Sequence, residues 1–576
     1  MRVAEAVGRG LAGLGVNTVF GVVGSGNFHV TNALVAGGAR FVAARHEGGA
    51  TVMADAWART TGSPGVVTVH QGPGLTNAMT GIAEAAKSRT PLLVLAAEAP
   101  EVRSNFHVDV AGLAAAVGAA SDRLYSPASA LADAHRAYAT ALGRRTVVLA
   151  LPLNVQAAQY QPAQYQPAQG EPGPVPALRR TYPVAPAAEA VTALADLLRG
   201  ARRPVFIAGR GARGQAAELE RVADACGALL ATSAVAKGLF HGSPWSLDVS
   251  GGFASPLAAE LISEADVIVG WGCSLNMWTM RHGRLIGPQA TLVQVDDDPA
   301  AIGAYRPVHL GVPGDVAQTA RAVAGALADG GSGEDAGRET RPVRDHESAG
   351  AVGEPPAAGY RSAAVRKRIA GQVRWRDVPY KDEGDGERID PRTLSIALDD
   401  LLPAERTVAV DSGNFMGYPS MYLSVPDEAG FCFTQAFQSI GLGLATAIGA
   451  AVARPDRLTV AALGDGGALM GVSELETVAR LGLPMVVVVY DDEAYGAEVH
   501  HFGPDGDPLD TVRFPPADIA SIGRGFGFEG VTVRSAEDLA AVRGWLDGPR
   551  ERPLLIDAKV ASAHGSWWLE EAFRGH

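Results

Sequence analysis

Two aspartates stand at the ends of two apolar runs in the last third of the chain. Asp465 follows the run 458–464 and lies between glycines, and Asp492 follows the run 485–490. Neighbouring parallel strands end at one edge of a sheet, so we expect the two carboxylates to lie together. The segment 468–482 has helical periodicity, and a helix that begins at this edge directs free N–H groups toward an anion. Oxygen ligands beside an anion site predict Mg²⁺ or Ca²⁺ bound to a diphosphate.

The same residues have a plainer interpretation. Gly464, Asp465 and Gly466 can form only a turn, and Asp491 and Asp492 can belong to a solvated loop. The tripeptide alone leaves both interpretations open, so the elements around it must decide.

Short apolar runs rich in β-branched residues alternate with helical patterns throughout the sequence. Continuous apolar strands alternating with helices predict parallel sheets covered on both faces. We therefore expect an α/β fold with three doubly wound parallel-sheet domains. The strand-like runs lie at 17–24, 65–72 and 91–98, at 204–211, 266–272 and 291–299, and at 407–414, 458–466, 484–492 and 553–560.

Two polar stretches divide these domains. Residues 156–181 contain a tandem QYQPA repeat and are rich in Pro and Gln, which predicts an extended linker. Residues 329–384 begin with a polar, Gly- and Pro-rich stretch and are predicted to be a mobile linker. The expected domains are therefore 1–155, 182–328 and 385–576.

Composition narrows the class of protein. The chain has 576 residues and a net charge of −13, which argues against a nucleic-acid partner. Its three cysteines are too few for a disulfide framework, which fits a reducing cytoplasm. The expected signs of a signal peptide, a basic start followed by an apolar core, are not seen in the sequence. No apolar run reaches the roughly 20 residues that a membrane span needs.

The residues around Asp465 belong to a longer pattern. The Gly-Asp-Gly turn is followed by a helix, a strand and "YDDEAYG", and the N-terminal third contains "RHEGGATVMADAWARTTG" and "GPGLTN". In these motifs the chain resembles the thiamine diphosphate enzymes of the acetolactate synthase and benzoylformate decarboxylase superfamily, over nearly all of its length outside the two linkers. The resemblance implies that the three domains are a pyrimidine-binding, a central and a diphosphate-binding domain. It also implies that Asp465, Asp492 and the backbone carbonyl of Ala494 bind Mg²⁺. It departs at Asp491, where the family has Asn, and the extra charge would weaken diphosphate binding unless Asp491 points away.

The resemblance assigns a second half of the site to the N-terminal domain. Glu47 would hydrogen-bond the cofactor's aminopyrimidine ring; taken alone, it is an acid stabilised at a helix N-terminus. His70 and Ser25 match a His and a Ser of benzoylformate decarboxylase. Because His shuttles protons near neutral pH, His70 is predicted to act in acid–base catalysis, with a structural His as the alternative. His29, with a surface His as its alternative, and Gln71 are further catalytic candidates.

The other predicted site residues surround the cofactor and substrate. Ile440 falls where the family has a bulky apolar residue that props the cofactor into a bent shape, and a core Ile is the plainer interpretation. His501 stands where acetolactate synthases carry a Trp, and His500 precedes it. We expect both, with Ser25 and His70, to meet the substrate; a surface role stays open. The residues predicted to bind the cofactor, besides Glu47, are Gly72, Asn77, Gly413, Asn414, Ile440, Gly464, Gly466, Gly467, Tyr495 and Gly496.

A glycine motif in the central domain points to a different cofactor. Gly209, Gly211 and Gly214 form G-x-G-x-x-G after a strand, which is weak evidence alone for dinucleotide binding. No acid that would hold a ribose ends the next strand, so NAD is not expected. FAD is left open, because some members of the family bind it on this domain.

The resemblance implies a reaction and an assembly. We expect decarboxylation of a 2-oxo acid and addition to a second carbonyl compound, giving a 2-hydroxy ketone. His70 keeps simple decarboxylation open, and an FAD-linked oxidase or a non-catalytic cofactor-binding protein are further alternatives. Because the family completes its site with Glu47 and the metal ligands from different subunits, a homodimer or homotetramer is expected.

Overall fold

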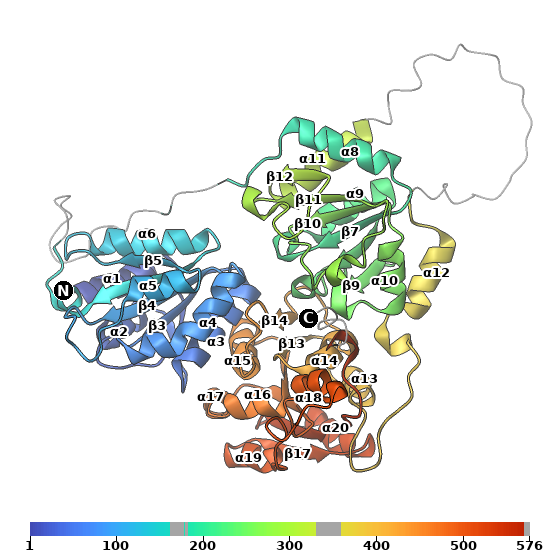
Figure 1. The fold of residues 1–576 in the computed structure, drawn as a ribbon. Coiled ribbons are helices and arrows are strands. Elements are labelled where there is room, and N and C mark those ends of the chain that lie inside the picture. The colour runs from blue at the N-terminus through green and yellow to red at the C-terminus, as the bar shows by residue number, and fades with distance from the viewer. Residues whose placement is uncertain (162–177, 179–181, 330–358, 570–576) are drawn as a thin grey trace, which may run out of the picture. The chain divides into compact units, whose positions relative to one another are not determined.

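Three six-stranded parallel sheets with flanking helices form the protein, as the alternating pattern predicts (Figure 1). The computed structural model describes residues 1–161, 178, 182–329 and 359–569. The chain divides into two compact units: one holds the first and third sheets, and the other holds the second sheet.

The first sheet has the strand order β2-β1-β3-β4-β6-β5, and all five pairings are parallel. Its central strand β3 is buried along its whole length, as expected for a sheet covered on both faces. The strands are β1 (Thr18–Gly21), β2 (Arg40–Ala43), β3 (Gly65–Val69), β4 (Leu92–Glu98), β5 (Ala120–Arg123) and β6 (Thr146–Pro152). The helices are α1 (Val3–Gly13), α2 (Phe28–Ala36), α3 (Glu47–Thr61), α4 (Pro73–Lys87), α5 (Val110–Ala116), α6 (Ala130–Leu142) and α7 (Leu153–Ala157).

The second sheet has the order β12-β11-β10-β7-β8-β9 and is parallel throughout. Its strands are β7 (Pro204–Ala208), β8 (Leu229–Thr232), β9 (Ser246–Val249), β10 (Val267–Trp271), β11 (Thr291–Asp296) and β12 (Leu310–Pro313). Its helices are α8 (Ala188–Gly200), α9 (Ala216–Cys226), α10 (Pro256–Ser263), α11 (Val316–Asp329) and α12 (Ala363–Gln372).

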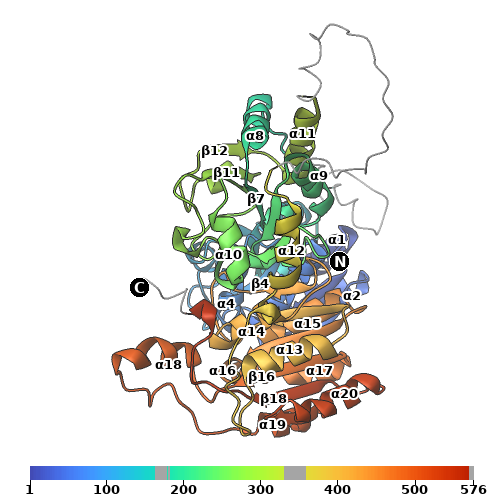
Figure 2. The ribbon, with the colours of Figure 1, turned by 90° about the vertical axis from the view of Figure 1, so that its right-hand side faces the viewer.

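The third sheet, coloured from yellow to red in Figures 1 and 2, has the order β14-β13-β15-β16-β18-β17. Its strands from β13 to β17 in that order pair in parallel. The strands are β13 (Arg406–Val410), β14 (Phe431–Phe433), β15 (Leu458–Gly464), β16 (Met485–Asp491), β17 (Glu529–Val533) and β18 (Leu554–Lys559). The helices are α13 (Pro391–Leu401), α14 (Gly417–Tyr422), α15 (Gly443–Ala453), α16 (Asp465–Met470), α17 (Glu474–Leu481), α18 (Gly496–Phe502), α19 (Ile519–Gly525) and α20 (Ala540–Asp547).

The structure differs from the expected linkers and from one expected helix. Within 329–384, residues 330–358 lie outside the described residues, but 363–372 form α12, and Tyr360 and Ile369 are buried in the core of the second sheet. Of the segment 156–181, residues 162–177 and 179–181 are likewise not described. The single helix expected over 468–482 is two helices, α16 and α17, broken at Gly471, Val472 and Ser473.

Helices α3 and α15 join the first and third sheets within their unit. Both contribute to one apolar cluster. They cross closely at Gly449, where a Cβ atom would stand 2.2 Å from the backbone oxygen of Met53. Only glycine allows this approach of the two backbones.

A buried ion cluster lies at the same junction. The Arg59 guanidinium contacts Asp55 at 2.8 Å and Glu84 at 2.7 Å, and the two carboxylate side chains are fully buried. Arg59 also donates to the carbonyl of Phe433 at 2.9 Å, while Glu84 accepts from the backbone N–H of Phe437 at 2.6 Å. The cluster therefore fastens α3 and α4 to the loop that follows β14.

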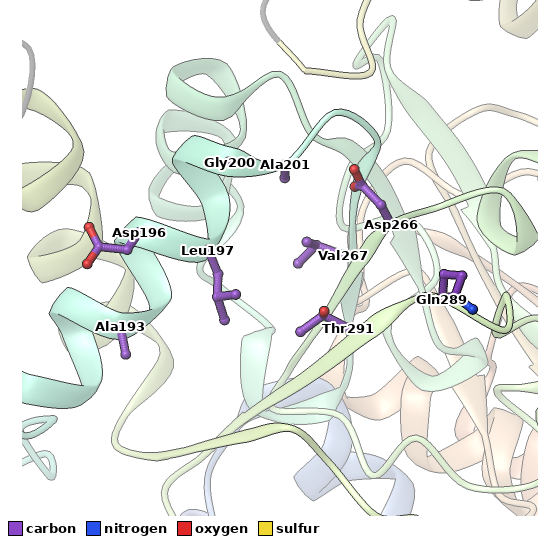
Figure 3. A pocket seen from close by; sticks show the side chains of 9 residues that line it. All are labelled: Ala193, Asp196, Leu197, Gly200, Ala201, Asp266, Val267, Gln289 and Thr291. Carbon is purple, nitrogen blue, oxygen red and sulfur yellow. The ribbon is translucent and has the colours of Figure 1, made fainter.

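Three further observations bear on the class of protein. The three cysteines, Cys226, Cys273 and Cys432, are buried and free of disulfides. None of the helices in the described ranges combines the length and apolarity that a membrane crossing needs. An open cavity of about 560 Å³ lies in the central domain, where Val267 and Thr291 begin β10 and β11 (Figure 3). This is the opposite end of the sheet from where α/β domains bind ligands.

Candidate active site

The structure brings Asp465 and Asp492 together at the carboxyl edge of the third sheet. Asp465 follows β15 as the first residue of α16, and Asp492 comes directly after β16. The two strands are neighbours, with Gly464 opposite Tyr490. The two carboxyl groups are close enough that the charge of Asp492 raises the pKa of Asp465. Gly496 leaves room for them, because a Cβ atom there would stand 2.3 Å from Oδ2 of Asp492.

These two carboxyls have an unfavourable environment for negative charge. Burial raises the pKa of both groups; the charge of Asp492 raises that of Asp465 further, and the charge of Asp491 raises both. Neither forms an ion pair with a Lys or Arg among the described residues. A pair of buried carboxylates without a cationic partner favours binding of a cation or a proton.

The donor set fits Mg²⁺ better than a metal held by protein alone. Among the described residues, no group of three or more His, Cys, Asp or Glu side chains could hold a metal ion. Two carboxylates therefore need ligands from elsewhere, and Mg²⁺ commonly combines one or two carboxylates with phosphate oxygens and water.

The turn after Asp492 is held tightly. Ala494, the residue predicted as the third ligand, lies in a β-bridge with Arg513. The N–H groups of Tyr495 and Phe514 donate to the carbonyls of Val512 and Glu493, each at 2.8 Å. Glu493 adopts a left-handed conformation, with φ of 57°, and its side chain pairs with Arg388 at 2.7 Å. Such a conformation in a non-glycine residue is uncommon and often marks a functional site.

The glycines of this edge are required by packing. A Cβ atom on Gly464 would meet the ring of Phe415 at 3.0 Å, and one on Gly466 would meet the ring of Tyr495 at 2.7 Å. One on Gly467 would meet a carboxylate oxygen of Asp411 at 2.3 Å. Packing therefore explains these glycines without a ligand, and they carry no independent evidence for one.

Asp411 is a residue that the sequence reasoning missed. It follows β13, is fully buried, and accepts hydrogen bonds from the N–H groups of Gly441 at 3.0 Å and Leu442 at 3.2 Å. It thereby fixes the turn that carries Ile440, which is half-buried. An Asp directly after an apolar run, as at Asp465, was the available signal.

The other predicted residues of this edge lie close to Asp411. Gly413 has a φ of 137°, and the adjacent Asn414 is buried. The Cβ of Asn414 lies near the backbone of Gly496, so the turn after β13 and the turn after β16 meet.

The N-terminal half of the predicted site gathers around Glu47. Glu47 begins α3, and its carboxylate accepts a hydrogen bond from Asn77 Nδ2 at 3.1 Å. The backbone before it is held by Glu474, whose carboxylate accepts the N–H groups of Arg45 at 3.0 Å and His46 at 3.1 Å. Glu474 was also missed, because nothing in the sequence links it to a turn more than 400 positions away.

His70 lies beside Glu47 in a defined orientation. Its Nδ1 faces the backbone N–H of Gly26 at 3.2 Å, and its ring meets Phe106 edge-on at 5.6 Å. Burial lowers the pKa of His70, although the charge of Glu47 raises it. With Nδ1 as acceptor, the neutral ring carries its proton on Nε2, the atom left for a substrate.

A buried polar atom next to His70 has no partner. The side-chain oxygen of Gln71 is buried and accepts no hydrogen bond, and a Cβ on Gly26 would overlap it at 1.7 Å. Gly72, which follows, has a φ of 68° and precedes α4. A buried acceptor without a donor is costly unless a ligand or water supplies one.

The remaining candidates are dispersed. Ser25 and His29 are exposed, and His29 contacts Arg2 at 2.7 Å. His500 on α18 packs against Gly565, and burial lowers its pKa; its Nε2 is buried without a partner. His501, next to it, packs edge-on against Phe502 at 4.6 Å.

Among the described residues, no hydrogen bond or ion pair joins Glu47 or His70 to Asp465 or Asp492. The two halves of the predicted site belong to one compact unit, in which Glu474 of α17 contacts the turn before Glu47.

The glycine motif of the central domain has a structural explanation. A Cβ on Gly209 would stand 2.3 Å from the carbonyl oxygen of Gly272, and one on Gly211 would stand 2.9 Å from its Cα. The N–H of Gly214 donates to Glu428 at 2.8 Å. The motif thus serves close packing of β7 and β10, and it gives no support to a dinucleotide.

Three domains of thiamine pyrophosphate enzymes match the chain. The N-terminal TPP binding domain matches residues 1–116, the central domain 191–323, and the C-terminal TPP binding domain 411–558. These ranges contain Glu47 and His70 at one end and the paired aspartates at the other.

Curated relatives match along most of the chain. A probable 2-ketoarginine decarboxylase of Pseudomonas aeruginosa is 29% identical over 93% of this chain and 89% of its own. A sulfoacetaldehyde acetyltransferase of Alcaligenes xylosoxydans xylosoxydans is 27% identical over 91% and 87%. An acetolactate synthase large subunit of Parasynechococcus marenigrum is 28% identical over 95% and 85%.

The printed names of these relatives differ in their reactions, whereas two of the three domain models that match this chain are named for binding thiamine pyrophosphate. The chain therefore belongs to the thiamine pyrophosphate-dependent enzymes.

Proposed function

We propose that the protein uses thiamine diphosphate and Mg²⁺ to decarboxylate a 2-oxo acid and to join the remaining acyl carbon to a second carbonyl compound. The products are CO₂ and a 2-hydroxy ketone. The observation that carries the proposal is the pair of Asp465, which is buried, and Asp492, which is partly buried. Neither has a cationic partner among the described residues at this carboxyl edge of a parallel sheet.

The residues present fit the cofactor. Asp465 and Asp492 would hold Mg²⁺ and, through it, the diphosphate, with the carbonyl of Ala494 as a further ligand. Ile440, fixed by Asp411, would support the cofactor in its bent form. When bound, thiamine diphosphate supplies a carbon nucleophile and accepts the electron pair left when CO₂ departs.

The chain's own residues then act on protons. Glu47, held on its turn by Glu474 and hydrogen-bonded to Asn77, would hold a proton at the aminopyrimidine ring. His70 would donate its Nε2 proton to the oxygen of the substrate carbonyl as bonding changes there, and recover it afterwards. Both roles need the two residues in one domain, as they are here.

Simple decarboxylation is the second candidate. A His placed to protonate the carbon from which CO₂ has left would yield an aldehyde instead of a hydroxy ketone, and His70 is suited to this role. The 2-ketoarginine decarboxylase among the relatives gives this candidate weight.

The active form would be at least a homodimer, because no hydrogen bond or ion pair among the described residues joins Glu47 to Asp465, and the resemblance implies a site completed by two subunits. In a dimer, the N-terminal domain of one subunit can face the C-terminal domain of its partner. An active monomer in a sedimentation experiment contradicts this part of the proposal.

A panel of 2-oxo acids tests the function. CO₂ release is measured with thiamine diphosphate and Mg²⁺ for wild type and Glu47→Gln, with and without an aldehyde or a second 2-oxo acid as acceptor. The panel includes pyruvate and 2-ketoarginine. We expect release from at least one acid and its loss in Glu47→Gln. A hydroxy ketone identifies ligation and an aldehyde identifies simple decarboxylation; no release from any acid contradicts both.

A further inference from the structure

A third carboxylate stands directly beside the paired aspartates. Asp491 is the last residue of β16 and precedes Asp492, and it is only 1% exposed. Its charge raises the pKa of both Asp465 and Asp492. If its side chain turned toward them, three carboxylates would surround one cation.

Lys559 neutralises this third carboxylate. It is the last residue of β18, lies opposite Asp491 in the parallel pairing, and is 6% exposed. Its ammonium group donates to Oδ2 of Asp491, while Oδ1 accepts the backbone N–H of Glu493 at 3.1 Å. Both oxygens of Asp491 are therefore occupied by donors.

The two adjacent carboxylates have different surroundings. Asp491 is the last residue of β16 and shares a face of the sheet with its paired residue Lys559. Asp492 follows the strand, and its carboxyl group lies close enough to Asp465 for its charge to raise the pKa of Asp465.

The ammonium group of Lys559 contacts three oxygen atoms. Its Nζ donates to the carbonyl of Ala517 at 2.9 Å and lies 3.2 Å from Asp557 Oδ1. The other oxygen of Asp557 accepts the N–H of Ile519 at 3.2 Å. Burial lowers the pKa of Lys559, but the hydrogen bond and charge of Asp491 raise it more, and the ammonium stays charged. A side chain held by three acceptors has little freedom to release Asp491.

We propose that Lys559 is a positioning residue that holds the Asp491 carboxylate away from the cation site, so that the cation keeps coordination positions for a diphosphate. This inference rests on the proposed function of the Asp465 and Asp492 pair. Mg²⁺ retains only a few protein carboxylates when it binds phosphates. A third one would bind the cation more tightly and exclude the phosphate oxygens.

The test separates affinity for the metal from affinity for the cofactor. Binding of Mn²⁺ alone, used in place of Mg²⁺, is measured by electron paramagnetic resonance, and binding of thiamine diphosphate with Mg²⁺ is measured by calorimetry. Both titrations are done at pH 8 on wild type, Lys559→Met, Asp491→Asn and the double variant. Lys237→Met, which removes another buried lysine, is the matched control.

We expect opposite shifts in Lys559→Met: Mn²⁺ binds at least threefold more tightly, and thiamine diphosphate binds at least tenfold more weakly. The double variant should match Asp491→Asn within threefold in both titrations, and Lys237→Met should match wild type. Weakening of both ligands in Lys559→Met, or no change in either, overturns the proposal.

Two outcomes need separate treatment. If Lys559→Met does not fold, the double variant is compared with Asp491→Asn. Once the Asp491 carboxylate is absent, loss of Lys559 should have no effect. A tenfold weaker binding of thiamine diphosphate by the double variant than by Asp491→Asn overturns the proposal. If wild type does not bind thiamine diphosphate, the proposed function fails. The Mn²⁺ titrations still test Lys559, since only Lys559→Met should bind Mn²⁺ more tightly.

Discussion

Arg59 is predicted to be indispensable to the unit that contains both halves of the candidate site. Its side chain is 6% exposed and lies between Asp55 and Glu84, whose side chains are fully buried. Arg59→Met keeps most of the side-chain volume but leaves two buried carboxylates without their cation. It also leaves the carbonyl of Phe433 without its donor.

Removing one partner of a buried ion pair costs about 3–5 kcal/mol, because the charge that remains is neither solvated nor paired. In wild type, burial raises the pKa of Asp55, whereas the charge of Arg59 and the hydrogen bonds to Glu84 together outweigh burial and lower the pKa of Glu84. In the variant both carboxyls should have raised pKa values. A carboxyl with a raised pKa destabilises the folded state increasingly as pH rises from its pKa in the unfolded chain to the raised value. The loss should therefore be larger at pH 8 than at pH 5.5.

Hydrogen exchange of peptides that cover α3, measured as a function of urea, gives the local free energy of opening. The matched control is Arg552→Met, since Arg552 lies 3.6 Å from Glu529 and both side chains are exposed. An exposed pair is worth about 0.2–1 kcal/mol. The reasoning is refuted if Arg59→Met costs no more than Arg552→Met, or if its cost does not depend on pH.

Three further predictions concern single residues. Burial raises the pKa of Asp411 to about 6, so the free energy of unfolding of wild type, measured in urea titrations, should fall by up to about 3 kcal/mol relative to Asp411→Asn between pH 4 and 7. The same dependence on pH in both proteins contradicts this. Gly449→Ala should lower the free energy of unfolding by about 1–3 kcal/mol, because its Cβ meets the Met53 backbone, whereas Gly544→Ala, in open space, should be neutral or stabilising. His70→Asn should lower kcat by about 10²–10⁴-fold with little change in KM, and an unchanged kcat contradicts its role. Because burial lowers the pKa of His70, the acidic limb of the profile of wild-type kcat against pH should lie below pH 6.5.

The fold and the meeting of Asp465 with Asp492 could be predicted because they depend on local patterns. Continuous apolar runs indicate buried parallel strands, and acids directly after two such runs must share an edge when the strands are neighbours. The same logic applied to Asp411, although its role in fixing the turn at Ile440 needs the structure.

The supporting contacts could not be predicted, because they join residues far apart in the sequence. Glu474 holds the turn before Glu47, and Lys559 on β18 pairs with Asp491 on the neighbouring strand β16. Each residue alone resembles an ordinary surface charge. The central G-x-G-x-x-G shows the opposite case, since a pattern typical of a ligand site serves close packing at Gly209.

The most direct test of the account is a calorimetric titration of thiamine diphosphate into wild type and Asp465→Asn, each with Mg²⁺ and with EDTA. We predict saturable binding to wild type with Mg²⁺, and its loss with EDTA and in Asp465→Asn, while circular dichroism shows both proteins equally folded. Binding that survives both EDTA and the substitution would contradict the assignment of the paired aspartates as the cation site.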